Sequence, residues 1–143
     1  MFEQCLYFNT TALARQLERE WTKAFAPFSL SPSQAFMLRT ILDRPGSLQW
    51  ELAESMFISR PTATRALDGL SRKGMVERRS SGRDGREQSI HPTAAATAIH
   101  GALNEASGRV TKRLKKLLGE ETFREAVTRV QGVRSALDRK SVV

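Results

Sequence analysis

Apolar residues recur at helical spacing along most of this chain, and the pattern predicts a mainly helical protein with one small hairpin. A first helix is predicted over residues 5–26, because from residue 13 onward every fourth position is apolar, as expected for one face of a helix. This stripe consists of Leu13, Leu17, Trp21 and Phe25. Pro27 follows and is expected to end the helix.

Three shorter helices are predicted next, each introduced by a serine that is placed to cap it. Ser31 is followed by Pro32 and, three residues after the cap, by Gln34, which makes a capping box and begins a helix that runs to about Leu42. The helices that start at Ser47 and Ser59 are expected to run to about residues 56 and 73. The residues expected to face inward in these helices are Ala35, Leu38, Ile41, Leu42, Leu52, Ala53, Met56, Ala63, Ala66, Leu67 and Leu70.

The fourth helix is followed by a hairpin pattern. Gly74 ends the helix, residues 75–79 and 87–92 read as extended runs, and a polar tip lies between them. A helix-turn-helix pair followed by a hairpin is the layout of a winged helix, whose second helix enters a major groove while the hairpin reaches the DNA backbone or minor groove.

Two amphipathic helices are predicted after the hairpin, over residues 93–118 and 121–140, with Gly119 between them. Together with the first helix they carry more apolar surface than one small winged helix can cover. A homodimer built from both chain ends would bury it. The predicted fold class is therefore mainly α with a small β-hairpin wing, with the winged helix-turn-helix at about 31–92 and dimerisation helices at about 1–30 and 93–143 of one domain.

Composition narrows the class of protein. The chain has 143 residues, a hydrophobic fraction of 40% and no apolar run near the ~20 residues of a membrane span, so no membrane partner is expected. The first residues lack the pattern of a signal peptide. Cys5 is the single cysteine, which excludes an internal disulfide and suits the cytoplasm.

Positive charge is concentrated in the predicted recognition helix and wing. Residues 59–86 contain eight Arg or Lys and three acids, which is +5 of the chain's formal +8. Phosphate binding needs this local cationic density, so double-stranded DNA is the expected partner.

The motifs of this region resemble those of the MarR family of bacterial transcriptional regulators. They are Leu52-Ala53-Glu54, the run from Ser59 to Arg65, the run from Leu70 to Arg78, and Asp84-Gly85-Arg86 as the family's D-x-R motif. The chain departs from the family after the wing, where Pro92 and Ala96 replace the usual Leu and Gly. The resemblance implies a homodimeric regulator on a pseudo-palindromic operator, and release of DNA by an effector or by oxidation at the helical junction.

Candidate DNA contacts lie in the helix and in the wing. The cap and the exposed positions at the start of the helix suit phosphate and base edges, and Arg65 is the first choice for a base contact. For the wing, the resemblance implies that Asp84 orients the arginines. The alternative is a solvated helix face and an ordinary exposed hairpin. The candidates are Ser59, Arg60, Thr62, Thr64, Arg65, Arg83, Asp84 and Arg86.

Two candidate effector sites lie in the first helices. Aromatic residues there, including Tyr7 and Phe36, could line a pocket for a small aromatic acid with Arg15 or Arg39 as counter-ion, although such residues are more often simply core. Cys5 opens the first helix, where a helix N-terminus stabilises a thiolate, and a branch of the family senses hydroperoxides with a cysteine in a similar place. The alternative for Cys5 is a small buried hydrophobe.

Other chemistry is not expected. His91 and His100 have no carboxylates at ligand spacing, so neither a metal site nor a cofactor is predicted. No nucleophile and base arrangement stands out, so an enzyme is not expected. A cytoplasmic repressor is the favoured function. Two alternatives stay open, a non-specific architectural DNA-binding protein and a winged helix that acts as a protein-interaction module.

Overall fold

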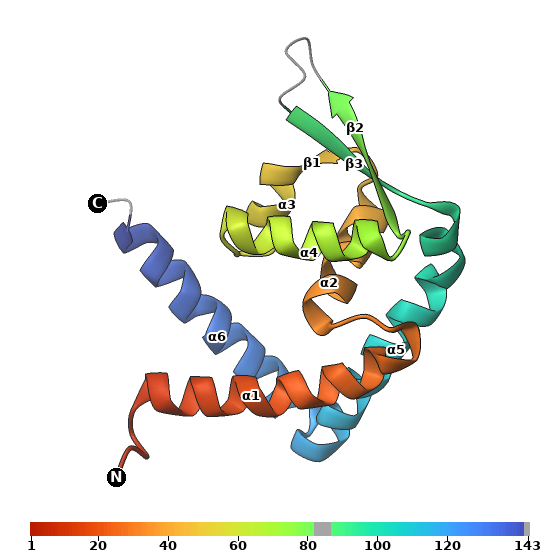
Figure 1. The fold of residues 1–143 in the computed structure, drawn as a ribbon. Coiled ribbons are helices and arrows are strands. Elements are labelled where there is room, and N and C mark those ends of the chain that lie inside the picture. Colours follow the sequence, from red (N-terminus) through yellow and green to blue (C-terminus); the bar gives the residue numbers. More distant parts are fainter. Residues whose placement is uncertain (82–86, 142–143) are drawn as a thin grey trace. The chain divides into compact units, whose positions relative to one another are not determined.

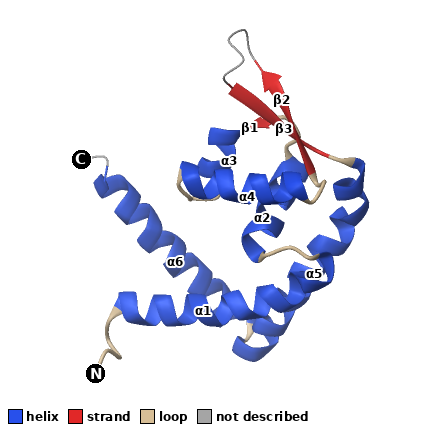
Figure 2. Cartoon of the chain, viewed as in Figure 1, coloured by secondary structure: helices blue, strands red, loops and turns tan. Residues whose placement is uncertain are grey.

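The computed structural model describes residues 1–81 and 87–141, and its elements match the predicted fold class of helices with one small antiparallel sheet (Figures 1 and 2). Two compact units, Met1–Ser107 and Gly108–Val143, divide the chain. The elements are α1 (Leu6–Phe25), the 3-10 helix η1 (Ala26–Phe28), α2 (Pro32–Asp43), β1 (Ser47–Leu48), α3 (Gln49–Ser55), α4 (Arg60–Arg72), β2 (Val76–Ser81), β3 (Glu87–Pro92), α5 (Ala94–Leu118) and α6 (Glu120–Ser141).

Helices α2, α3 and α4 form the core of the first unit. The Ser31 capping box at α2 is confirmed, because the Ser31 hydroxyl accepts from the Gln34 N–H at 3.2 Å and Gln34 Oε1 accepts from the Ser31 N–H at 3.1 Å. Most of the residues predicted to face inward are buried, while Leu42 and Met56 are half-buried against the core. The core residues of these three helices are Ala35, Met37, Leu38, Ile41, Leu52, Ala53, Ala63, Ala66, Leu67 and Leu70.

The sheet has three strands in the order β1-β3-β2, one more than the predicted hairpin. Ser47 pairs with Ile90 and Leu48 with Ser89. The prediction that Ser47 caps α3 is therefore wrong: the cap position is Leu48, and the Ser47 hydroxyl donates to the Arg44 carbonyl at 2.7 Å. Glu51 accepts from the Leu48 N–H at 2.8 Å instead. Pairing with β3 takes Ser47 away from the helix start.

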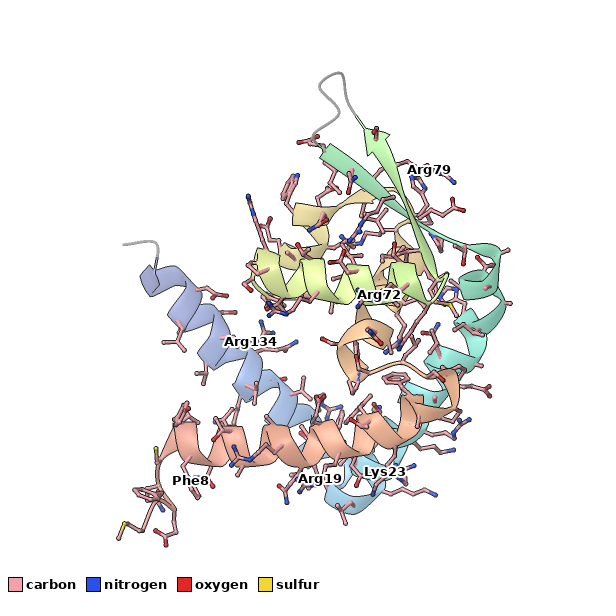
Figure 3. All side chains as sticks on the ribbon, in the orientation of Figure 1. Phe8, Arg19, Lys23, Arg72, Arg79 and Arg134 are labelled. Atoms are coloured by element: carbon pink, nitrogen blue, oxygen red, sulfur yellow. The ribbon has the colours of Figure 1, made fainter. Side chains whose placement is uncertain are left out.

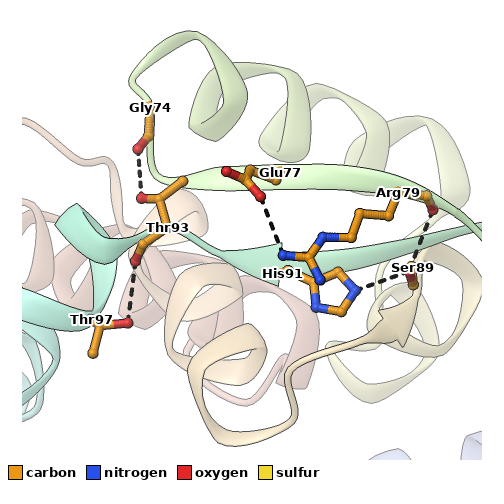
Figure 4. A network of polar contacts seen from close by, with 7 residues as sticks. All are labelled: Gly74, Glu77, Arg79, Ser89, His91, Thr93 and Thr97. Carbon is orange, nitrogen blue, oxygen red and sulfur yellow. Dashed lines mark hydrogen bonds and ion pairs between the residues drawn. The ribbon is translucent and has the colours of Figure 1, made fainter.

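The end of α4 fixes where the wing begins. Gly74 has φ +71°, its N–H bonds the Ser71 carbonyl at 3.0 Å, and the Met75 N–H bonds the Leu70 carbonyl at 2.9 Å. These two bonds form a Schellman motif, which ends the helix and turns the chain into β2. At the other end of the wing, the Thr93 hydroxyl donates to the Gly74 carbonyl at 2.7 Å (Figure 4). The chain therefore enters β2 and leaves β3 next to the same residue, Gly74.

The second unit contains the end of α5 and all of α6. Gly119 separates them with φ +88°, as predicted for a helix break. Several apolar side chains of this unit are exposed in the chain as described, including Leu117, Val127, Val130, Val133 and Leu137. In the part of the chain that the structure describes, no helix has the length and apolar content needed to cross a bilayer.

Candidate nucleic-acid interface

The N-terminal half of α4 presents a connected polar face. Ser59 is the N-cap, and its hydroxyl accepts from the Thr62 N–H at 3.3 Å and donates to the Thr62 hydroxyl at 2.9 Å. Arg65 Nη2 donates to the same Thr62 hydroxyl at 3.2 Å. Ser59 and Arg65 are exposed, and Thr62 is half-buried. The Arg65 guanidinium is therefore oriented by a neighbour and keeps donors available for a base edge or a phosphate.

The side chains of Arg60 and Thr64, both predicted DNA contacts, point in different directions. Arg60 is exposed at the first position of α4. Thr64 is half-buried, and its hydroxyl accepts from Gln49 Nε2 at 2.7 Å and donates to the Arg60 carbonyl at 3.0 Å. These bonds turn the Thr64 hydroxyl toward α3, where it links the two helices of the helix-turn-helix.

The two arginines of β2 also differ. Arg78 Nη2 donates to Asp68 Oδ1 of α4 at 2.7 Å, whereas Arg79 is exposed and pairs with Glu77 at 3.4 Å. Arg79 lies on β2, and Arg72 is the last residue of α4 (Figure 3). Successive side chains of a strand point to opposite faces of the sheet, which accounts for the different partners of Arg78 and Arg79. Arg83, Asp84 and Arg86, the predicted wing contacts, lie outside the described residues.

A shallow cavity of about 260 Å³ lies between the start of α3, the start of α4 and β3. Trp50 and Arg60 line it together with Gln88. Trp50 is 46% exposed, which is unusual for a tryptophan outside a contact surface. Trp50 is the second residue of α3, two residues after the end of β1, and this position brings it beside Arg60.

A second cavity, which we call the α1–α2 cavity, has a volume of about 480 Å³. Its main lining residues are Leu17, Glu18, Trp21, Pro32, Phe36 and Met56. Phe36, one of the predicted effector residues, is therefore in a cavity wall. Tyr7, Arg15 and Arg39 are not among the residues that line it. Tyr7 is 78% exposed in the first turns of α1.

Arg39 is held by a network that joins α1, α2 and α5. Its Nε donates to Asn104 at 2.8 Å, and its Nη1 donates to the Ser107 hydroxyl at 3.1 Å. Trp21 Nε1 donates to the same hydroxyl at 3.1 Å. Burial lowers the pKa of the Arg39 guanidinium below its usual value, and the Asp43 carboxylate opposes that shift. Ser107 is the acceptor that both donors share.

Cys5 is the N-cap of α1 and is exposed. Its Sγ accepts from the Phe8 N–H at 3.5 Å, so sulfur faces the first turn of the helix. Within residues 1–81 and 87–141 there is no group of three or more His, Cys, Asp and Glu side chains that could hold a metal ion. His91 lies in β3 and contacts the Ser89 hydroxyl at 3.0 Å (Figure 4).

Comparison with known proteins agrees with the winged-helix fold. Residues 28–87 match the family model described as MarR family. A MarR protein from Peptoclostridium difficile is similar in structure, with a TM-score of 0.85 and 17% identity over 96% of this chain and 90% of that chain. The S. aureus MepR–DNA complex gives a TM-score of 0.83 and 18% identity over 94% and 99% of the chains. The M. tuberculosis transcriptional regulator MOSR, in complex with DNA, gives 0.77 and 26% over 93% and 98%. Among curated proteins, none has a sequence that matches.

Proposed function

We propose that this winged-helix protein, whose residues 28–87 match the MarR family model, is a sequence-specific DNA-binding transcriptional regulator of that family. The observation that carries the proposal is the exposed face of α4, where Ser59, Thr62 and Arg65 are connected and Arg60 lies beside them. This face combines a helix N-terminus with two arginines, which suits phosphate and guanine edges. The similar MepR and MOSR structures, which were solved with DNA, support it.

The proposed mode of binding places α4 in a major groove, with the wing on the adjacent backbone or minor groove. Arg65 is the proposed base contact, because Thr62 orients it. Arg60 and the cap Ser59 are proposed phosphate contacts. Thr64 acts indirectly, since its hydroxyl is committed to Gln49 and Arg60. Arg83, Asp84 and Arg86 remain proposed wing contacts.

We further propose a cytoplasmic homodimer that acts as a repressor. The apolar side chains that α1 and α6 leave exposed would form its interface, with residues 1–30 and 93–143 as the dimerisation region and 31–92 as the DNA-binding lobe. Two lobes would then read half-sites about 10 bp apart on a pseudo-palindromic operator. The exposed apolar residues of these helices are Leu6, Tyr7, Phe8, Leu13, Val127, Val130, Val133 and Leu137.

Release of DNA is proposed to follow binding of a small molecule at the helical junction, or oxidation of Cys5. The α1–α2 cavity provides space for the first. The exposure of Cys5 and its position at the start of α1 are compatible with the second. Either signal can act only if it favours the state that does not bind DNA.

Two alternative functions would give different binding behaviour. A non-specific architectural protein would show steep salt dependence with little preference among sequences. A protein-interaction module would use the basic face for an acidic partner and would not need Arg65 to be oriented. The connected Ser59, Thr62 and Arg65 face favours base readout over both.

The test measures binding by fluorescence anisotropy to two DNA duplexes. One carries a site that the protein has selected from a random DNA pool, and the other has the same bases in scrambled order. Arg65→Ala should weaken binding to the selected site by about 1–3 kcal/mol more than binding to the scrambled duplex. Arg19→Ala removes the same charge from exposed α1 and serves as the control, with little effect expected on either duplex (Figure 3). Equal losses on both duplexes for Arg65→Ala would mean that this arginine reads no base.

A further inference from the structure

We propose that the α1–α2 cavity binds a flat apolar molecule that carries a single positive charge. The cavity has a volume of about 480 Å³, which is within the size range of small-molecule sites. It lies wholly within the first compact unit, between α1, α2 and the residue that ends α3. The inference rests on the proposed function only for what occupancy does to DNA binding, because it names the ligand class of the effector site.

The sign of the ligand charge follows from the lining residues. Among those that the structure describes, Glu18 is the single ionisable one, and no Arg, Lys or His lines the cavity. Glu18 has no hydrogen-bond or ion-pair partner within residues 1–81 and 87–141. A carboxylate at the edge of an apolar cavity attracts a cation and repels an anion.

The expected counter-ions for an aromatic acid are placed elsewhere. Arg15 is exposed on α1 and does not line the cavity. Arg39 donates to Asn104 and Ser107, and its guanidinium lies over the ring of Phe36 at 5.0 Å from the centroid. An acidic ligand would have to break the Arg39 network to gain a partner, so the cavity disfavours the aromatic acid that the sequence suggested.

The aromatic walls add a second reason for a cation. The Trp21 ring is held in one orientation, because its Nε1 donates to the Ser107 hydroxyl at 3.1 Å. Phe36 is an apolar wall and not a second cation site: Phe25 packs against it edge-on with ring centroids 5.9 Å apart, and the Arg39 guanidinium already lies over its ring. Tryptophan is the strongest side chain for a cation–π contact, and a fixed ring needs little reorganisation to make one.

The cavity also reaches the helix-turn-helix. Met56, which lines it, is the C-cap of α3 and is followed by Phe57, whose φ of +57° is unusual for a bulky residue. Ser59, the N-cap of α4, lies three residues after Met56. A ligand in the cavity thus touches α1, α2 and the turn that sets the start of the recognition helix, and it can couple to DNA binding through that turn.

The test is isothermal titration calorimetry of the full chain without DNA. The probes are 1-naphthylmethylammonium, 1-naphthylmethanol and 1-naphthoate, which share a ring system and differ in charge. The cation should bind about three- to fivefold more tightly than the alcohol, as expected for one partly exposed charge pair, and the anion should bind least. Glu18→Gln should remove the preference for the cation and leave affinity for the alcohol unchanged.

Two further variants locate the effect. Glu20→Gln removes a carboxylate from the same helix at a position that does not line the cavity, so it should leave all three affinities unchanged. Ala14→Phe fills the cavity from α1 and should abolish binding of the cation and the alcohol. Equal affinity for cation and anion, an unchanged preference in Glu18→Gln, or no binding of any probe because a second copy of the chain covers the cavity would each overturn the proposal. None of these results depends on DNA binding, so they are separate from the proposed function.

Discussion

Arg78 of β2 donates from Nη2 to Asp68 Oδ1 of α4 at 2.7 Å, and this ion pair joins the start of the wing to α4. The side chains of Arg78 and Asp68 are 24% and 43% exposed, so the pair is partly shielded from solvent. The Schellman turn at Gly74 joins the same two elements through the backbone. The described part of the wing is therefore fixed to α4 by two independent connections.

This pair should contribute measurably to stability. Asp68→Ala and Arg78→Ala should each lower the free energy of unfolding by about 1 kcal/mol, with a coupling energy near 0.5–1 kcal/mol because the pair is only partly buried. A double-mutant cycle by urea unfolding measures the coupling. The pair Glu77 and Arg79 is the matched control, since both side chains are more than half exposed, and its coupling should be close to zero. Equal coupling in both cycles would contradict the role given to Arg78.

Thr64 should act through helix packing and not through base contact. Thr64→Val removes the hydroxyl that accepts from Gln49 at 2.7 Å, and the loss should cost about 1 kcal/mol of unfolding free energy. The sequence preference of DNA binding should not change. Competition among single-base variants of a bound site measures this preference, and a preference that changed at one base pair would place Thr64 on the DNA.

Ser107 should be needed for the junction of α1, α2 and α5. Ser107→Ala leaves Trp21 Nε1 and Arg39 Nη1 without their shared acceptor, and should cost about 1–3 kcal/mol of unfolding free energy. Ser55→Ala, at an exposed site in α3, should cost little. Thermal unfolding of the two variants provides the comparison, and similar midpoints would show that the Ser107 network is not stabilising.

The exposed apolar face of α6 should form part of a dimer. Val130→Asp places a charge on a residue that is 52% exposed in the single chain, and should shift the protein toward monomer by a cost of several kcal/mol if the interface buries it. Thr128→Asp is the control for an added charge on the same helix. Sedimentation equilibrium measures both, and an unchanged molecular mass for Val130→Asp would exclude this face from the interface.

The sequence was most informative where local rules decide the structure. The Ser31 capping box, the Ser59 cap and the break at Gly119 depend on neighbours in the chain, and all three are confirmed. The prediction that Ser47 caps a helix is wrong because Ser47 pairs with Ile90, which lies far along the chain, and such pairing leaves no local pattern.

The residue types of the candidate site were predictable from the sequence, but the directions of their side chains were less so. Charge and spacing predicted the arginines at the start of α4, and the structure describes Arg60 and Arg65 there as exposed; Arg83 and Arg86 lie outside the described residues and stay predictions. The turn of Thr64 toward Gln49, the partner of Arg78, and the position of Trp50 beside Arg60 all depend on packing between elements. The charged side chains that line the α1–α2 cavity could not be predicted from the sequence, because they depend on the tertiary arrangement of α1 and α2.

The most direct test of the central claim is selection of binding sites from a random DNA pool by the purified protein near physiological salt. A dimeric sequence-specific regulator should enrich a two-fold symmetric site with half-sites about 10 bp apart. Arg65→Ala should lose that enrichment, because the oriented arginine is the proposed base contact. Retention of DNA by the unmodified chain with no enriched sequence would contradict the account and would favour an architectural protein that binds the backbone alone.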